Sequence, residues 1–132
     1  MEGDVKLAEV EPQFVRYVTQ DKDEQFAEGR SVPAEYLRHV DSLAEAQGIQ
    51  FLCPVCFAKN AGPIGTHPIE ISFAGKGVAD HQGSRNREGK PSRWSASGSG
   101  YNDLTTTPSI LIDPSLPGCA GWHGFITNGE IQ

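Results

Sequence analysis

The sequence predicts a mainly β fold, a small antiparallel sheet domain with one short helix and long loops. Gly occurs 15 times and Pro 9 times among 132 residues, and this turn-rich composition suits many short strands. Ile69, Ile71 and Phe73 alternate with polar neighbours, as in a strand that has one buried face. The dipeptide Asn128-Gly129 favours a tight hairpin turn, because both residues tolerate positive φ angles.

Length and composition predict one domain over residues 1–132. A chain with 37% hydrophobic residues at this length can bury a modest core. We expect N-terminal strands and a loop over residues 1–37, followed by the core over residues 38–132.

Charge argues against a protein whose main partner is nucleic acid. The formal net charge is -6 and the pI is about 5.1, whereas phosphate binding needs clustered Lys and Arg. The densest basic stretch, residues 85–93, also holds Glu88, Gly89 and Pro91, and it predicts a flexible loop that can contact an anion.

The sequence also argues against a membrane partner. Apolar runs stay well short of the roughly 20 residues that a spanning helix needs. Glu2 and Asp4 stand where a signal peptide would be basic. We therefore expect a cytoplasmic location, where thiols are reduced, and metal binding explains the 3 cysteines better than disulfides do.

The first third of the chain predicts strands, a polar connection and the short helix. Residues 5–19 are extended and β-branched around Pro12, which suits one or two strands. Residues 20–35 are polar and predict a loop or an exposed hairpin. Asp41 can cap a helix over residues 42–47, which Gly48 would end in the left-handed conformation.

The middle of the chain predicts two strands around a cysteine turn. Residues 49–52 form an apolar strand that leads into Cys53-Pro54-Val55-Cys56, and the turn is closed by residues 60–65. Residues 69–73 form the alternating strand. A long irregular loop follows over residues 75–91, and Trp94 begins a strand over residues 94–97.

The last third predicts short strands separated by turns. Residues 98–100 are a flexible turn, and residues 104–112 have β-type composition around Pro108, with residues 110–112 the paired part. Pro114, Pro117 and Gly118 turn the chain into residues 119–123. A strand over residues 124–127 precedes the Asn128-Gly129 hairpin.

The cysteine pattern predicts a structural zinc ion bound by Cys53, Cys56, Cys119 and His123. In Cys-x-x-Cys a tight turn brings both thiolates to one ion, and Cys119 with His123 supplies a second pair. Soft thiolates with one imidazole select Zn2+ over Mg2+ or Ca2+, and four protein ligands leave no open position.

Other interpretations of these residues stay open. Cys-x-x-Cys also occurs in redox motifs, although those begin the helix of a βαβ unit, which the pattern here lacks. The cysteines can also be buried apolar residues. If the zinc ion is catalytic, His67 is a candidate extra ligand or acid-base group, and Glu70 or Asp103 a candidate general base. Trp94 and Trp122 suit core packing better than a cation cage.

A set of motifs runs over most of the chain, from about residue 38 to residue 129. These motifs are Phe51-Leu52-Cys53-Pro54-Val55-Cys56-Phe57, Gly65-Thr66-His67, Arg93-Trp94-Ser95, Leu104-Thr105, Thr107-Pro108-Ser109-Ile110 and Trp122-His123-Gly124-Phe125-Ile126-Thr127-Asn128-Gly129. Together they resemble a family of small phage and prophage proteins, domain of unknown function 6527. Some members are labelled ammonia monooxygenase, an activity that this sequence does not support, because it lacks membrane spans and a copper-type histidine cluster.

The family's second ligand pair is usually Cys-x-x-His, whereas here three residues separate Cys119 from His123. The C-terminal knuckle and hairpin are also similar to the zinc-bearing β-tent fold of methionine sulfoxide reductase B and cereblon-type domains. The reductase's distal catalytic cysteine has no counterpart after Cys119.

The resemblance implies a phage protein that is not an enzyme. Such a protein would be a virion component or a protein-interaction module, with a virion or host protein as partner and the host cytoplasm or the virion as location. The alternative is a zinc-dependent hydrolase, peptidase-like or deaminase-like.

Overall fold

The computed structural model describes residues 5–112, 114 and 118–132, and within them the fold is mainly β, as predicted. The helical elements are η1 (Leu7–Val10, a 3-10 turn), α1 (Lys22–Ala27) and α2 (Pro54–Asn60). The strands are β1 (Val5–Lys6), β2 (Gln13–Thr19), β3 (Glu35–Val40), β4 (Gly48–Leu52), β5 (Pro68–Ser72), β6 (Ser95–Ser97), β7 (Thr105–Thr107), β8 (Ile110–Ile112), β9 (Trp122–Gly124), β10 (Ile126–Thr127) and β11 (Glu130–Ile131).

A four-stranded antiparallel sheet in the order β3-β2-β4-β5 forms the centre of the molecule. The predicted apolar face of β5 is confirmed, because Ile69 and Ile71 are buried, as is Phe73 just after the strand. Ser72, predicted on the solvent face, is buried as well. Ile71 lies opposite Ile49 of β4, so one face of this sheet carries the apolar core.

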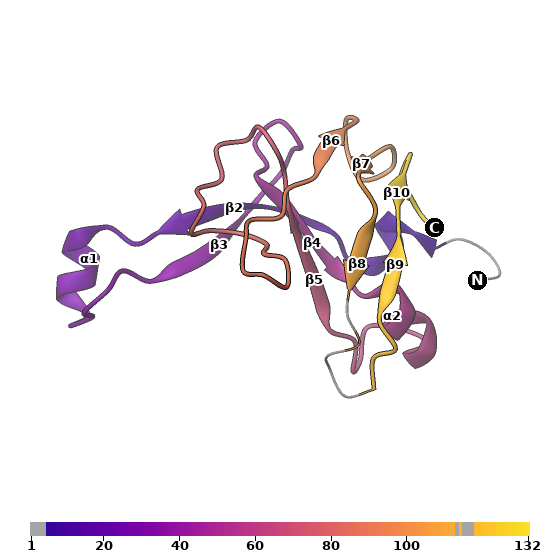
Figure 1. Ribbon diagram of the computed structural model, residues 1–132, viewed down its shortest axis with the longest axis horizontal. Coiled ribbons are helices and arrows are strands. Elements are labelled where there is room, and N and C mark those ends of the chain that lie inside the picture. Colours follow the sequence, from indigo (N-terminus) through magenta and orange to yellow (C-terminus); the bar gives the residue numbers. More distant parts are fainter. Residues whose placement is uncertain (1–4, 113, 115–117) are drawn as a thin grey trace.

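The remaining strands form three small sheets beside the central one (Figure 1). β8 pairs with β9 and β6 with β7, while β11 joins β10 to the N-terminal β1. The predicted hairpin at Asn128 and Gly129 is confirmed, and their φ angles of 49° and 77° fit its tight turn.

The β2–β3 hairpin projects from the body as an arm that carries α1 at its end (Figure 1). The end of this arm is formed by residues 20–35, the segment predicted as a loop or an exposed hairpin. Asp21 caps α1 by accepting a hydrogen bond from the Glu24 N–H at 2.8 Å. None of the residues of α1 is buried.

The helix predicted over residues 42–47 is wrong, since this segment is a turn. Tertiary bonds explain the difference: Gln47 donates its main-chain N–H to Val15 and accepts one from Phe73, so its backbone joins the sheet. Gly48 begins β4 rather than capping a helix. Among the described residues, two short α-helices therefore form in place of the single one expected, and one of them, α2, follows Cys53.

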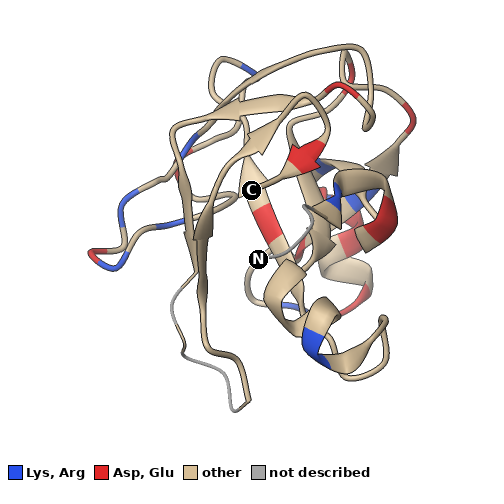
Figure 2. Ribbon diagram, turned by 90° about the vertical axis from the view of Figure 1, so that its right-hand side faces the viewer, with Lys and Arg blue, Asp and Glu red and all other residues tan. Residues whose placement is uncertain are grey.

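The N-terminal segment shares the core of the rest of the chain. Leu7, Val10 and Phe14 are buried in the same apolar cluster as Ile110 and Ile131. None of the helices among the described residues is long and apolar enough to cross a membrane. Lys and Arg lie on several separate segments rather than along one element (Figure 2).

Candidate metal centre

Three cysteines and one histidine from distant parts of the chain meet at one end of the central sheet. One ligand atom from each of Cys53, Cys56, His67 and Cys119 lies within 4.8 Å of all the others. The three cysteines are buried, with relative exposures of 0%, 5% and 8%, and His67 is partly buried. This group can hold one metal ion.

The β4–β5 ladder places Cys53 beside His67. Its last pair is Leu52 opposite Pro68, so the next residue outward on each strand is one of these two ligands. The Cys53 N–H donates to the His67 carbonyl oxygen at 2.9 Å, which continues the pairing for one more step.

Helix α2 turns Cys56 back toward Cys53. Cys53 is the N-cap residue and Pro54 lies in the first turn, where a residue without an N–H is tolerated. Residues three apart share one face of a helix, so both sulfur atoms point to the same side.

Cys119 arrives on the segment that leads into β9. Its sulfur accepts a hydrogen bond from the Gly121 N–H at 3.4 Å. Lys59, near the end of α2, donates to the Gly118 carbonyl oxygen at 2.9 Å. The rings of Phe51 and Trp122 pack edge to face with centroids 6.2 Å apart, which joins β9 to β4.

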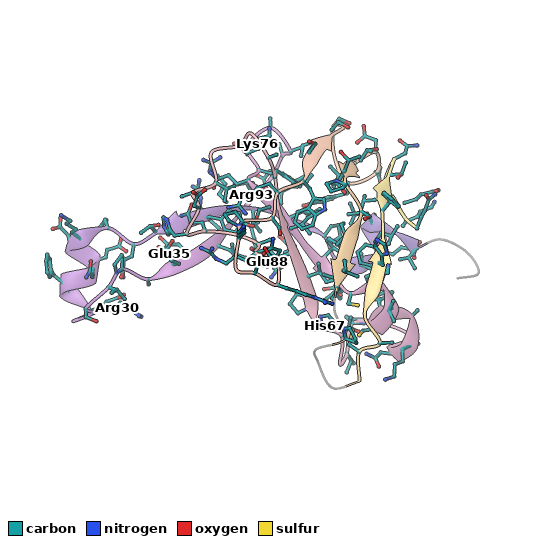
Figure 3. All side chains as sticks on the ribbon, in the orientation of Figure 1. Arg30, Glu35, His67, Lys76, Glu88 and Arg93 are labelled. Atoms are coloured by element: carbon teal, nitrogen blue, oxygen red, sulfur yellow. The ribbon has the colours of Figure 1, made fainter. Side chains whose placement is uncertain are left out.

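The His67 ring is oriented as a metal ligand. Its Nε2 lies 3.3 Å from the Cys119 sulfur, and its Nδ1 lies 3.2 Å from the Pro68 carbonyl oxygen. A histidine that ligates a metal through one nitrogen usually donates its other N–H to such a carbonyl, which fixes the tautomer. Figure 3 shows His67 close to sulfur atoms near α2, at the far side of the body from the arm.

The thiols differ in acidity because their surroundings differ. The Gly121 N–H and the His67 ring stabilise the thiolate of Cys119 and lower its pKa to about 7. Burial, followed by hydrogen bonds that the Cys56 thiol donates to Cys119 and Cys53, raises the pKa of Cys56 to about 12. A bound cation would favour the thiolate form at each position.

The structure places His123, the predicted fourth ligand, outside this cluster. His123 lies in β9 opposite Leu111, its side chain is exposed, and its Nε2 lies 3.0 Å from the Ser109 hydroxyl. Strand alternation explains this, since Trp122 packs against the core and the next residue must face away. The fourth residue of the cluster is His67, which the sequence indicates only as an extra ligand or acid-base group of a catalytic ion.

The residues considered for other chemistry lie in different surroundings. The Glu70 carboxylate accepts a hydrogen bond from the Tyr17 hydroxyl at 2.8 Å. Asp103 accepts bonds from the Ser99 and Gly100 amides, which lower the pKa of its carboxyl. Trp94 and Trp122 pack against the core.

The local fold does not support a redox role for Cys53 and Cys56. Cys53 does begin a helix, but the flanking strands β4 and β5 run antiparallel, so these elements do not form a parallel βαβ unit. Comparison of the chain with family models, curated proteins and solved structures gives no match.

Proposed function

We propose that this chain is a zinc-stapled module in which Cys53, Cys56, His67 and Cys119 hold one structural Zn2+. The donor set supports this proposal, because three thiolates and one imidazole form a common tetrahedral zinc site. Zn–S bonds of about 2.3 Å at tetrahedral angles separate sulfur atoms by roughly 3.8 Å, which fits a cluster of this size.

The position of the cluster supports a structural role for the ion. The ligands come from the start of α2, the residue just before β5 and the segment before β9, so one ion would join three parts of the fold. His67 and Cys119 are 52 positions apart, and closing so long a loop removes much freedom from the unfolded chain. In a domain of this size, metal-binding energy contributes directly to folding.

Four protein ligands argue against a zinc-dependent hydrolase. A catalytic zinc ion keeps one position for water or substrate, whereas His67 fills that position here. The burial of the three cysteines leaves their sulfur atoms little contact with solvent.

Cobalt substitution tests whether the site is closed. Co2+ in a site with three sulfur ligands and one nitrogen ligand gives strong tetrahedral absorption bands. We expect these bands to stay unchanged when azide or a hydroxamate is added, because no position is free for them. Bands that shift with added ligand would contradict a structural site and favour the hydrolase.

The arm supports the further proposal that the module binds another protein. Phe26 of α1 is 74% exposed and Val32 is 68% exposed, and both lie between β2 and β3 at the end of the arm. Exposed apolar side chains on a projecting element are available for contact with a protein partner. The resemblance to phage proteins suggests a virion or host protein as this partner, in the host cytoplasm or in the particle.

Site-specific photo-crosslinking tests the arm. A photoreactive residue in place of Phe26 should give one discrete adduct in cells that express the chain together with its partner. The same residue in place of Glu9, which is exposed on η1, is the matched control and should give none. The same adducts at both positions, or none at either, would contradict a role for the arm.

A further inference from the structure

A second site lies at the base of the arm, far from the metal centre. It is a cleft of about 250 Å³ between the β2–β3 hairpin, the edge strand β5 and the loop that contains residues 81–83. A cleft of this size can take a single side chain or a small molecule. In Figure 3 Glu35 marks its arm side, while Arg93 lies closer to the body.

Tyr17 forms the floor of the cleft. Its hydroxyl donates to Glu70 Oε2 at 2.8 Å and lies 2.7 Å from the Ser72 hydroxyl. Gly48 makes room for this arrangement, since a Cβ there would lie 2.7 Å from the Tyr17 hydroxyl and 2.6 Å from the Ile71 carbonyl oxygen. Burial raises the pKa of Tyr17 above its usual value, so this hydroxyl remains a donor.

Two carboxylates stand on opposite sides of this floor. Glu35 Oε1 accepts a hydrogen bond from the Thr19 hydroxyl at 2.9 Å and lies 3.2 Å from His81 Nε2. Its other oxygen, Oε2, accepts no hydrogen bond from the described residues, and the same holds for Glu70 Oε1. Each side therefore offers an acceptor that a ligand can use.

The loop wall is fixed in place by Arg93. Its guanidinium donates to the carbonyl oxygens of four residues, which are Ala79, Gln82, Ser84 and Ser92. Ser84 also donates its N–H to the buried Ser72 hydroxyl at 2.9 Å. Gly83 permits this close approach, because a Cβ there would overlap the Ser72 hydroxyl. Because these bonds already hold the loop in place, ordering it on ligand binding costs little free energy.

The charge of the cleft selects the ligand. The described residues that line it include Glu35 and Glu70 but neither Lys nor Arg. Arg93 lies behind the wall and interacts with Tyr17, so it offsets part of this negative charge while its N–H groups are used by backbone carbonyls. His81 shares one side of the cleft with Glu35.

We propose that this cleft binds an ammonium or guanidinium group held between the carboxylates of Glu35 and Glu70. Such a group carries several N–H donors and a positive charge, which matches the two unused acceptor oxygens. It can belong to a Lys or Arg side chain of a partner protein or to a small free amine. The proposal does not depend on the identity of the ion at the metal centre.

Nuclear magnetic resonance titration of the zinc-loaded chain tests this proposal. The probes are n-butylamine, methylguanidinium, and a blocked Gly-Lys-Gly peptide, with neutral n-butanol as the control ligand. We expect saturable shifts of the backbone amides of Tyr17, Glu35, Glu70 and Gly83 with the cationic probes and none with butanol. Tighter binding of the peptide than of butylamine identifies a partner side chain, and equal binding identifies a free amine.

Charge-neutral variants show whether the two carboxylates are responsible. Glu35→Gln together with Glu70→Gln keeps the acceptors that hold Thr19 and Tyr17 but removes both charges, and it should weaken binding by about tenfold or more. Glu9→Gln removes one exposed charge elsewhere and should leave binding unchanged. Shifts that fail to saturate, that spread over acidic residues throughout the chain, or that survive in the double variant would overturn the proposal.

Discussion

The main-chain N–H of Cys53 donates to the carbonyl oxygen of His67 at 2.9 Å, one step beyond the last pair of the β4–β5 ladder. This bond brings a cysteine from one strand end and a histidine from the next to the same place. The cluster is therefore built on the central sheet, with Cys119 added from the segment before β9.

His67 and His123 are predicted to differ sharply in their effect on zinc binding. His67→Ala should weaken the affinity for Zn2+ by more than the roughly 10–100-fold that loss of an outer hydrogen-bond partner costs, because it removes a ligand. His123→Ala removes an exposed side chain bonded to Ser109 and should leave the affinity unchanged. Competition titration with a chromophoric chelator measures both. The reverse order of effects would return His123 to the ligand set.

The three cysteines of this site could be predicted from the sequence, but the histidine could not be chosen by spacing. The spacing of Cys119 and His123 resembles that of two zinc ligands in one turn. The pairing of β9 with β8, however, turns the His123 side chain to the outside. His67 becomes a neighbour of Cys53 because β4 pairs with β5 in one particular register. A single sequence does not show which strands pair or in which register.

Local signals predicted some elements well and others poorly. Asn128-Gly129 and the apolar face that includes Ile71 depend on backbone preference and on one buried face, and both are confirmed. The segment 42–47 fails as a helix because the backbone of Gln47 bonds to two strands, a tertiary effect that outweighs local capping. The helix instead forms after Cys53, where Pro54 suits a first turn.

Removal of the metal is predicted to destabilise the whole fold. Cys119→Ser should lower Tm by more than about 10 °C, since each kcal/mol of lost stability lowers Tm by roughly 3–6 °C at this chain length. Thermal unfolding with and without a strong chelator measures this difference. As a control, chelated parent and chelated variant should unfold at similar temperatures, and Zn2+ but not Mg2+ should restore the parent. A variant that keeps its Tm in the presence of Zn2+ would refute a structural ion.

Zinc affinity is predicted to rise with pH, and more steeply below pH 7 than above it. Without metal the pKa of Cys119 is about 7 and that of Cys56 is about 12. Above pH 7 Cys119 has already lost its proton, whereas below pH 7 zinc binding must release that proton in addition to those released by the other ligands. The slope of log K against pH should therefore increase by about one below pH 7. Proton release in weakly buffered solution measures the same quantity, and an equal release at pH 6 and pH 8 would contradict the assignment.

Gly48 is predicted to be a position where added volume is costly. Gly48→Ala would push Cβ against the Ile71 carbonyl oxygen and the Tyr17 hydroxyl, and such overpacking costs about 1–3 kcal/mol. Gly100→Ala is the matched control, because a Cβ there meets nothing within 4 Å. Urea unfolding of both variants measures the difference. Equal stabilities would show that β4 and β5 can separate at Gly48 without cost.

The central claim is that Cys53, Cys56, His67 and Cys119 bind one zinc ion together. Zinc X-ray absorption spectroscopy measures this coordination shell directly. We predict three sulfur ligands at about 2.3 Å and one nitrogen ligand at about 2.0–2.1 Å, with the nitrogen signal lost in His67→Ala and kept in His123→Ala. A shell with fewer than three sulfur ligands, or one whose nitrogen signal survives in His67→Ala, would contradict it.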